Sequence, residues 1–344
     1  MSILDDQQKI KELDLSGMAS LLEKMPDQYF LAWKQSQKIK IPLNFKNINQ
    51  LVFCGLGGSG INGEIAQNLF SSQLKIPITI VRDQELPEFV NQQTLVFLTS
   101  YSGQTAETIS CAKQALAKKA LVFIITQGGA LKKLSQEKKL PGFIFDYPAP
   151  PRMSLPFLLM PVLIVMEKLG LVDLKKLKIE KALKKLSQIN QNFYLKTLTE
   201  KNMAKHLAYS LFDHLPIIIT PPSFSGIARR WKTQLEENSK NFCFFAFSPE
   251  IFHNFIEAEN PWRLKDEFIF LFFEKTENND SKIQGLKKIL NENNIEWKEI
   301  VKGENDFFQM IYLILWGDWL SFYLAILNQV DPTPVKKISE IKKL

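Results

Sequence analysis

Cysteine is scarce in this chain. Its 344 residues include three cysteines, Cys54, Cys111 and Cys243, which are unevenly spaced and lie in apolar stretches. An odd number of isolated thiols excludes a disulfide framework, and the lack of paired spacing argues against a zinc site. We therefore expect buried thiols in a reducing compartment, which predicts a cytoplasmic protein, and no metal site.

Neither a signal peptide nor a membrane span is expected from the sequence. Residues 1–6 are acidic and precede no apolar core of signal-peptide length. The apolar stretch 155–166 is short and contains two prolines, and the stretch 307–327 has Asp318 near its centre, where a charge is costly in lipid. Both stretches are expected to be buried helices, and no membrane partner is expected.

Positive charge is in excess but is not concentrated. The net charge is +7 and the pI is near 9.0, yet most of this charge is lysine spread over presumed helix faces such as 175–185. The balance favours an acidic small molecule, and no basic run is dense enough to indicate a nucleic-acid partner. Arginine is rare, so an arginine in an unusual place is informative; it occurs as Arg82, Arg152, Arg229, Arg230 and Arg263.

Apolar runs of strand length alternate with segments of helical periodicity, which predicts an α/β fold with doubly wound parallel sheets. The expected strands are 51–54, 78–81, 94–98, 120–126, 142–146, 216–220, 241–247, 268–273 and 296–301. The expected helices are 14–33, with Leu15 and Met18 toward the body, then 61–70, 104–117, 153–169, 174–189, 226–236, 281–293 and one from 307. The pattern runs through two cycles, which predicts an N-terminal unit (1–170), a helical linker (171–200), a C-terminal unit (201–330) and a tail (331–344).

A glycine-rich stretch, residues 55–60, separates the strand 51–54 from the helix 61–70. Such a turn directs free backbone N–H groups and the positive end of a helix at one point, a geometry that suits a phosphate. Gly57, Gly58 and Ser59 are the candidate contacts. A tight turn that needs glycine only for its backbone angles is the alternative.

A second candidate anion site follows the third strand. Ser100, Tyr101, Ser102 and Thr105 supply hydroxyl groups immediately before a helix. Serine and threonine are also ordinary helix N-cap residues, so this loop alone is weak evidence. Because the carboxyl ends of parallel strands meet at one sheet edge, the two loops together predict a site for a phosphomonoester.

A dinucleotide site is the rival interpretation. Gly55, Gly57 and Gly60 formally match the dinucleotide fingerprint, and Asp83 lies where a ribose-binding acid would be expected. Ser59, the additional Gly58 and the hydroxyl-rich second loop argue against it, since that loop would crowd a pyrophosphate. An NAD(P)-dependent oxidoreductase therefore remains the weaker alternative.

With both loops in view, the chain resembles the sugar isomerase (SIS) family, and within it the bifunctional phosphoglucose/phosphomannose isomerase branch, over nearly its whole length. Further marks of that branch are present in order: Pro151-Arg152, Glu236-Glu237-Asn238-Ser239-Lys240, His253-Asn254 and Asp331-Pro332-Thr333-Pro334. The resemblance implies two SIS-type subdomains, each a three-layer αβα structure, with a C-terminal helical tail. It also implies reversible isomerisation of glucose 6-phosphate, and of mannose 6-phosphate, with fructose 6-phosphate, without metal or organic cofactor.

The resemblance also assigns catalytic roles that make chemical sense for the residues concerned. Glu237, not Glu236, would move the proton between C2 and C1, and His253 would open the sugar ring, as suits a group that exchanges protons near neutral pH. Arg152 would stabilise the enediolate. On local grounds alone, two solvated acids, a half-buried histidine and an ion-paired arginine are the alternatives.

The tail carries the last two candidates. By resemblance, Thr333 leaves room for the substrate to turn about C2–C3, and Lys342 reaches the ring oxygen; otherwise they are a linker residue and a solvated lysine. His253 is expected from its own subunit or from the partner in a homodimer with shared active sites. The apolar helix from Phe307, with Trp316 and Trp319, is expected at the subunit interface. A non-catalytic sugar-phosphate-binding module is the other alternative.

Overall fold

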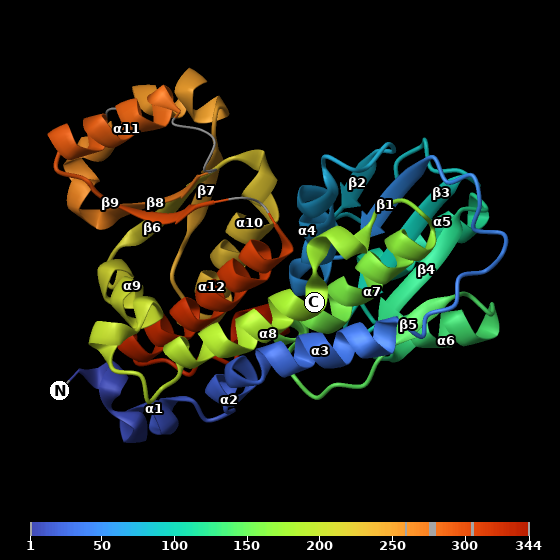
Figure 1. Cartoon of the computed structure of the whole chain (residues 1–344), viewed down its shortest axis with the longest axis horizontal. Helices are drawn as coiled ribbons and strands as arrows, with labels where there is room; N and C mark the ends of the chain where they lie inside the picture. The colour runs from blue at the N-terminus through green and yellow to red at the C-terminus, as the bar shows by residue number, and fades with distance from the viewer. Residues whose placement is uncertain (1, 259, 275–279, 304–305, 343–344) are drawn as a thin grey trace. The chain divides into compact units, whose positions relative to one another are not determined.

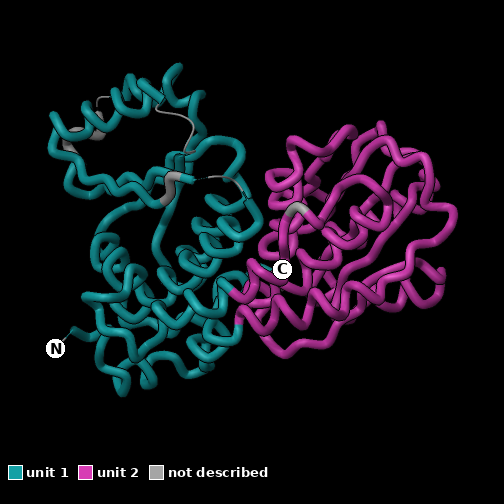
Figure 2. The backbone as a smooth tube through the Cα atoms, in the orientation of Figure 1, with its two compact units in different colours: residues 1–24, 185–344 teal, residues 25–184 magenta. Residues whose placement is uncertain are grey.

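The computed structural model, which describes all residues except 1, 259, 275–279, 304–305 and 343–344, contains two compact units (Figures 1 and 2). Unit 2 comprises residues 25–184. Unit 1 comprises residues 1–24 and 185–344, so the chain begins in unit 1, leaves it and returns to it (Figure 2). Each unit has its own parallel sheet, which confirms the predicted α/β architecture. The last two residues of the expected tail lie outside the described part of the chain.

Unit 2 has a five-stranded parallel sheet in the order β2-β1-β3-β4-β5. Its strands are β1 (Gln50–Cys54), β2 (Ile78–Val81), β3 (Thr94–Ser100), β4 (Leu121–Thr126) and β5 (Gly142–Ile144). Its helices are α3 (Met25–Ser36), α4 (Ile61–Phe70), α5 (Ala106–Ala117), α6 (Gly129–Glu137), α7 (Leu155–Lys168) and the first part of α8 (Ile179–Asn190). In this strand order the chain reverses direction across the sheet between β1 and β3, where α/β proteins bind ligands.

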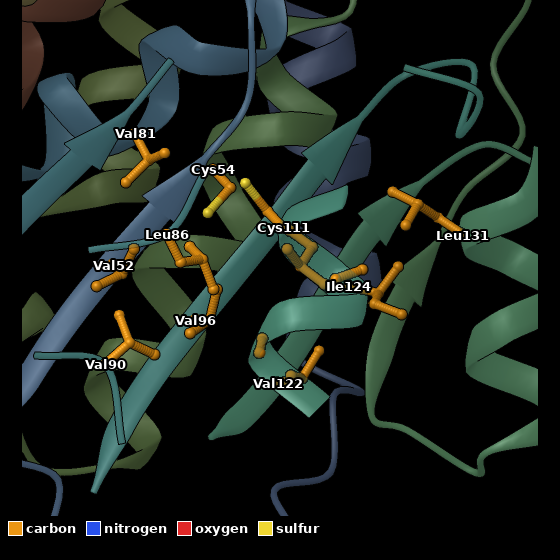
Figure 3. Packing of buried hydrophobic residues seen from close by; sticks show 13 residues of the cluster. Val52, Cys54, Val81, Leu86, Val90, Val96, Cys111, Val122, Ile124 and Leu131 are labelled. Atoms are coloured by element: carbon orange, nitrogen blue, oxygen red, sulfur yellow. The ribbon is translucent and has the colours of Figure 1, made fainter. Parts of the chain in front are cut away.

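The central strands are apolar throughout because both faces of the sheet are covered. Val52 and Cys54 of β1 and Val96 of β3 pack on one face with Cys111 of α5 (Figure 3). The residues between them face the other way, where the rings of Phe53 and Phe97 stack with centroids 4.6 Å apart. Both faces of the sheet are thus buried, and the candidate loops leave it at the carboxyl ends of β1 and β3.

Unit 1 has a four-stranded parallel sheet in the order β7-β6-β8-β9. Its strands are β6 (Leu215–Thr220), β7 (Phe244–Phe247), β8 (Phe268–Glu274) and β9 (Glu296–Lys302). Its helices are α1 (Gln7–Leu13), α2 (Met18–Glu23), the second part of α8, α9 (Met203–Leu211), α10 (Ser225–Gln234), α11 (Ser281–Glu292), α12 (Phe307–Leu327) and α13 (Lys336–Ile341). Residues of β8 and α11 form the core on one face of this sheet.

The long apolar helix α12 is buried inside unit 1. Within the described residues it is the one helix with the length and hydropathy to cross a membrane, and almost all of it is covered by the protein. Trp316 and Trp319 are 5% and 0% exposed in the single chain, so the apolar character of α12 gives no evidence for a subunit interface, contrary to expectation. Asp318 is buried in a bidentate ion pair with Arg230 of α10 at 3.0 and 2.7 Å.

Besides the stretch 174–189, which a left-handed backbone at Lys178 divides into η4 (Leu174–Leu177) and α8, two expected helices differ from the structure. The stretch 14–33 is not one helix, because Gly17 has a left-handed backbone and a break at Lys24 separates α2 from α3; Leu15 is 78% exposed instead of facing the body. The stretch 226–236 is α-helical only to Gln234 and continues as a π-helical turn, η8 (Leu235–Ser239). This second difference affects the candidate site directly, because Glu237 lies in η8.

Candidate functional site

The two predicted anion loops follow neighbouring strands of unit 2. The strands β1 and β3 pair in parallel, with Cys54 opposite Leu98, so both loops leave the same sheet edge. The first loop passes through a short 3₁₀ turn, η2 (Gly57–Gly60), into α4, and the second leads into α5. The N-cap residues of the two helices, Gly60 and Thr105, make no side-chain capping hydrogen bond, and Oδ1 of Asn62 accepts from the backbone N–H of Gly63 in the first turn of α4. The N-termini of both helices therefore lie at this edge, where their backbone N–H groups favour an anion.

Ser59 connects the two loops. Its hydroxyl oxygen accepts a hydrogen bond of 3.1 Å from the backbone N–H of Tyr101, and the side chain is 7% exposed. Since this bond uses an oxygen lone pair, the hydroxyl hydrogen of Ser59 remains available to a ligand. The expectation that the two loops converge is confirmed by this contact.

The hydroxyl groups of the second loop form a local network. Ser100 is buried, and its Oγ lies 2.8 Å from Oγ1 of Thr105 and accepts from the backbone N–H of Gly103 at 3.1 Å. Ser102 is exposed, and its Oγ accepts from the backbone N–H of Gln104. The loop thus presents hydroxyl groups in fixed positions beside the start of α5, an arrangement able to hold an anion.

The first loop brings Arg152 to the site. Gly57 has a φ of +52°, which favours glycine, and a Cβ on Gly58 would lie 3.2 Å from Cα of Arg152. Arg152 lies in the 3₁₀ turn η3 (Pro151–Met153) and is 4% exposed. The hydroxyl of Tyr101 donates to the carbonyl oxygens of Tyr147 and Ala149 at 3.1 and 2.6 Å, just before η3. Tyr101 therefore anchors the segment that carries Arg152.

Arg82 is a neighbour of the site that sequence reasoning missed. It follows β2, and its Nε lies 3.8 Å from the position of a Cβ on Gly60. Its guanidinium donates to the carboxylate of Glu64 on α4 at 2.5 Å. The scarcity of arginine together with its position after a strand was the available signal, since ligands bind at the carboxyl ends of parallel strands.

The candidate base lies in unit 1. Glu237 is half-buried in η8, whose residue Asn238 donates to Oγ of Ser321 on α12 at 2.9 Å. Neighbouring Glu236 is engaged by Lys232 at 2.5 Å. A π-helical turn shifts the register of the side chains that follow it and occurs often at functional sites. Both glutamates thus lie on a turn that is tied to the core helix, and Glu236 is held by Lys232.

Thr333 and Lys342 also belong to unit 1. The backbone N–H of Thr333 donates to Oδ1 of Asp331 at 2.9 Å, which holds the loop between α12 and α13 as a compact turn. Lys342 follows α13 and is exposed. Of the residues expected to act on the sugar, Arg152 is thus in unit 2, whereas the others lie in unit 1.

His253 is an exposed residue of unit 1. It ends the 3₁₀ turn η9 (Glu250–His253), in which Ile251 is buried and Phe252 packs against the core of this unit. The apolar neighbours therefore anchor the turn, and the imidazole faces solvent in the single chain. Within the described residues, no group of three or more His, Cys, Asp or Glu side chains is placed to hold a metal ion.

Comparisons with known proteins agree with the two-unit α/β fold. Residues 44–139 match the SIS domain, and residues 200–344 match the bacterial phospho-glucose isomerase C-terminal SIS domain. Among solved structures, the C-terminal domain of glucosamine-fructose-6-phosphate aminotransferase from Francisella tularensis shares the fold, with a TM-score of 0.68 at 16% identity over 92% of this chain and 98% of that one.

Two curated proteins are similar over most of their length. The bifunctional phosphoglucose/phosphomannose isomerase of Caldicellulosiruptor bescii is 35% identical over 92% of this chain and 96% of its own. The protein of the same name from Aquifex aeolicus is 34% identical over 85% of this chain and 89% of its own. On this similarity, the chain belongs to the bifunctional phosphoglucose/phosphomannose isomerase family.

Proposed function

We propose that this chain catalyses the reversible isomerisation of glucose 6-phosphate, and of mannose 6-phosphate, with fructose 6-phosphate. The observation that carries the proposal is the contact between Ser59 and Tyr101, which joins two hydroxyl-bearing loops at the ligand-binding edge of the sheet in unit 2. The names of the curated relatives support the choice of substrates. A cytoplasmic location is consistent with the three buried free thiols.

The phosphate is assigned to unit 2. In this proposal the hydroxyl groups of Ser59, Ser100, Ser102 and Thr105 donate to the phosphate oxygens, and the backbone of Gly57 and Gly58 approaches it closely. Tyr101 contributes by holding the loops in place. Arg152, buried beside Gly58, supplies a permanent positive charge where the enediolate oxygens develop negative charge.

The proton transfers are assigned to unit 1. His253 donates a proton to the ring oxygen as the C1–O5 bond breaks, O1 gives up its hydroxyl proton to solvent and becomes the C1 carbonyl oxygen, and Lys342 reaches the ring oxygen. The carboxylate of Glu237 then removes the proton from C2 of the aldose and returns it to C1. The hydroxyl proton of O2 is transferred to O1 through the enediol, so that C1 carries a hydroxyl group and C2 becomes the ketose carbonyl. Thr333 leaves room for rotation about C2–C3, so that either face of C2 is protonated in the reverse direction. These steps use protein groups alone, and no metal or organic cofactor enters the proposal.

A homodimer with shared active sites is part of the proposal. The exposed position of His253 at the end of η9 supports it. An imidazole that is exposed in the single chain is able to reach a substrate bound by a second subunit. The burial of α12 in the single chain means that the interface has to use other surfaces.

One coupled assay tests the function. Purified protein is given fructose 6-phosphate, and glucose 6-phosphate and mannose 6-phosphate are measured separately, with and without EDTA. We expect both products at rates that EDTA leaves unchanged. Binding of fructose 6-phosphate without formation of either product would indicate a non-catalytic sugar-phosphate module, and turnover that requires NAD(P) would indicate an oxidoreductase.

A further inference from the structure

Lys240 connects two candidate catalytic segments that are far apart in the sequence. It directly follows the π-helical turn η8, which carries Glu237. Its Nζ donates to the carbonyl oxygen of Glu237 at 2.5 Å and to that of Pro334, next to Thr333, at 2.7 Å. One ammonium group thus joins the turn of the proposed base to the loop of the proposed specificity threonine.

Further contacts hold the same turn against the core. Asn238 donates to Ser321 of α12, and Asn328, just after α12, donates to the carbonyl oxygen of Ser239 at 2.8 Å. These bonds fix η8 to the helix, and Lys240 extends the connection to the loop that follows. The bond from the N–H of Thr333 to Asp331 closes that loop, so a displacement of Pro334 also displaces Thr333.

Lysine at position 240 has two explanations: it ends a helix, or it bridges two segments through its ammonium group. The backbone at Lys240 is left-handed, with φ at +63°, a conformation that glycine adopts at helix ends without steric cost. Lysine also occupies this conformation at positions 119, 139 and 178, so the backbone alone does not demand a special role. The two carbonyl contacts distinguish Lys240 from a lysine that merely ends a helix.

We propose that Lys240 is a positioning residue that sets the relation between Glu237 and Thr333. This inference rests on the proposed function. Since Thr333 is assigned the space for rotation about C2–C3, its placement relative to the base decides which face of C2 meets the carboxylate. Lys240 therefore affects both the rate of proton transfer and the ratio of mannose 6-phosphate to glucose 6-phosphate. It touches carbonyl groups and not the substrate.

The substitution Lys240→Gly removes the bridge while suiting the left-handed backbone. We expect kcat with fructose 6-phosphate to fall about tenfold, within the range that a misplaced catalytic group costs. KM should change by less than about twofold, because the phosphate contacts lie in unit 2 and an interaction specific to the transition state lowers kcat selectively. The product ratio should shift, and Lys240→Arg should restore both values because guanidinium can also donate to two carbonyl oxygens.

Lys139→Gly is the matched control, since Lys139 is exposed and left-handed after α6 in unit 2. It should leave kcat and the product ratio at wild-type values, and urea unfolding should show both glycine variants at least as stable as the wild type. Equal kinetics of the two variants, or a loss of activity in Lys240→Gly that Arg does not restore, would overturn the inference while leaving the isomerase function standing. A wild-type protein without isomerase activity would contradict both the proposed function and the inference about Lys240.

Discussion

The backbone N–H of Tyr101 and the hydroxyl oxygen of Ser59 are 42 positions apart in the chain and form a hydrogen bond of 3.1 Å. The bond crosses between the loops that follow β1 and β3, and it is part-buried. It therefore fixes the hydroxyl of Ser59 and the second loop relative to each other. The substrate anion would meet two loops that are already fixed relative to each other, which lowers the entropic cost of binding.

This geometry predicts that Ser59→Ala weakens substrate binding. In the proposal the substitution removes one donor to the phosphate, and it leaves the part-buried N–H of Tyr101 without its acceptor, each a loss of about 1–3 kcal/mol. We expect KM for fructose 6-phosphate to rise at least about tenfold, since 1.4 kcal/mol corresponds to that factor. Steady-state kinetics and competition by inorganic phosphate measure the effect. Ser71→Ala, at the end of α4, is the control and should match the wild type; an unchanged KM for Ser59→Ala would remove Ser59 from the phosphate site.

The π-helical turn predicts different results for two adjacent glutamates. Glu237→Gln keeps the size and the turn but cannot accept a proton, so we expect binding of fructose 6-phosphate to persist and kcat to fall by a factor of about 10²–10⁴. Glu236→Gln should retain most activity, because Glu236 pairs with Lys232 in a half-exposed ion pair worth about 1 kcal/mol or less. Calorimetric binding and the coupled assay distinguish the two variants. Near-normal turnover in Glu237→Gln would exclude it as the base.

Local sequence patterns predict most of the fold. Strands that are covered on both faces are continuous apolar runs in the sequence, and glycine-containing turns separate them from the helices. The strands β2 and β8 and the helix α4 match their expected ranges within one residue. The helix from Phe307 shows the limit of such reasoning. Its aromatic residues were expected at a subunit interface, but α9, α10 and the N-terminal segment cover them, and an amphipathic pattern cannot reveal which partner covers an apolar face.

The candidate site was predictable where neighbouring strands place it. The loops after β1 and β3 converge because parallel pairing brings carboxyl ends together, and that follows from the order of strands and helices. The register change at η8 was not predictable, since Arg230, Gln234 and Asn238 face α12 through contacts made with Asp318 and Ser321, far along the chain. No local signal in the residues around Glu237 reports those partners.

The ion pair between Lys205 and Asp5 predicts acid sensitivity of unit 1. Lys205 has a fully buried side chain and donates to Asp5 at 3.0 Å and to the carbonyl oxygens of Leu195 and Thr197. Burial alone raises the pKa of Asp5, but the hydrogen bonds from Lys205 and Thr199 outweigh it and hold the pKa below its ordinary value. A carboxyl group with a lowered folded-state pKa contributes stability above its unfolded value of about 3.9 and loses it as the pH falls further.

We therefore expect Asp5→Asn to be less stable than the wild type at pH 7, and the difference to shrink as the pH falls from about 5 toward 3, where Asp5 in the unfolded chain becomes protonated. Urea unfolding at a series of pH values measures this. Asp213→Asn, an exposed aspartate of the same unit, is the control and should lack such a trend. A stability difference that stays constant down to pH 3 would show that the Asp5 charge contributes nothing to folding.

The exposed position of His253 predicts complementation between two inactive variants. If each active site combines Glu237 of one subunit with His253 of its partner, then in a heterodimer of Glu237→Gln and His253→Ala one site carries both substitutions and the other carries neither. Mixing the two variants under conditions that exchange subunits should therefore restore activity, although each homodimer is inactive. With random pairing, half of the dimers are mixed and hold one intact site in two, so recovery should approach a quarter of the wild-type rate, about 25%, if the sites act independently.

The alternative arrangement gives a clear contrary result. If His253 acts in the same subunit as Glu237, every site in the mixture lacks one of the two groups, and exchange restores nothing. Subunit exchange itself is checked by mixing a tagged and an untagged wild-type chain and isolating the tagged protein. Demonstrated exchange without recovery of activity would place His253 in its own subunit's site. A protein that stays monomeric at assay concentration but is fully active would exclude shared sites altogether. A single chain would then suffice for the proton transfers that we assign to Glu237 and His253.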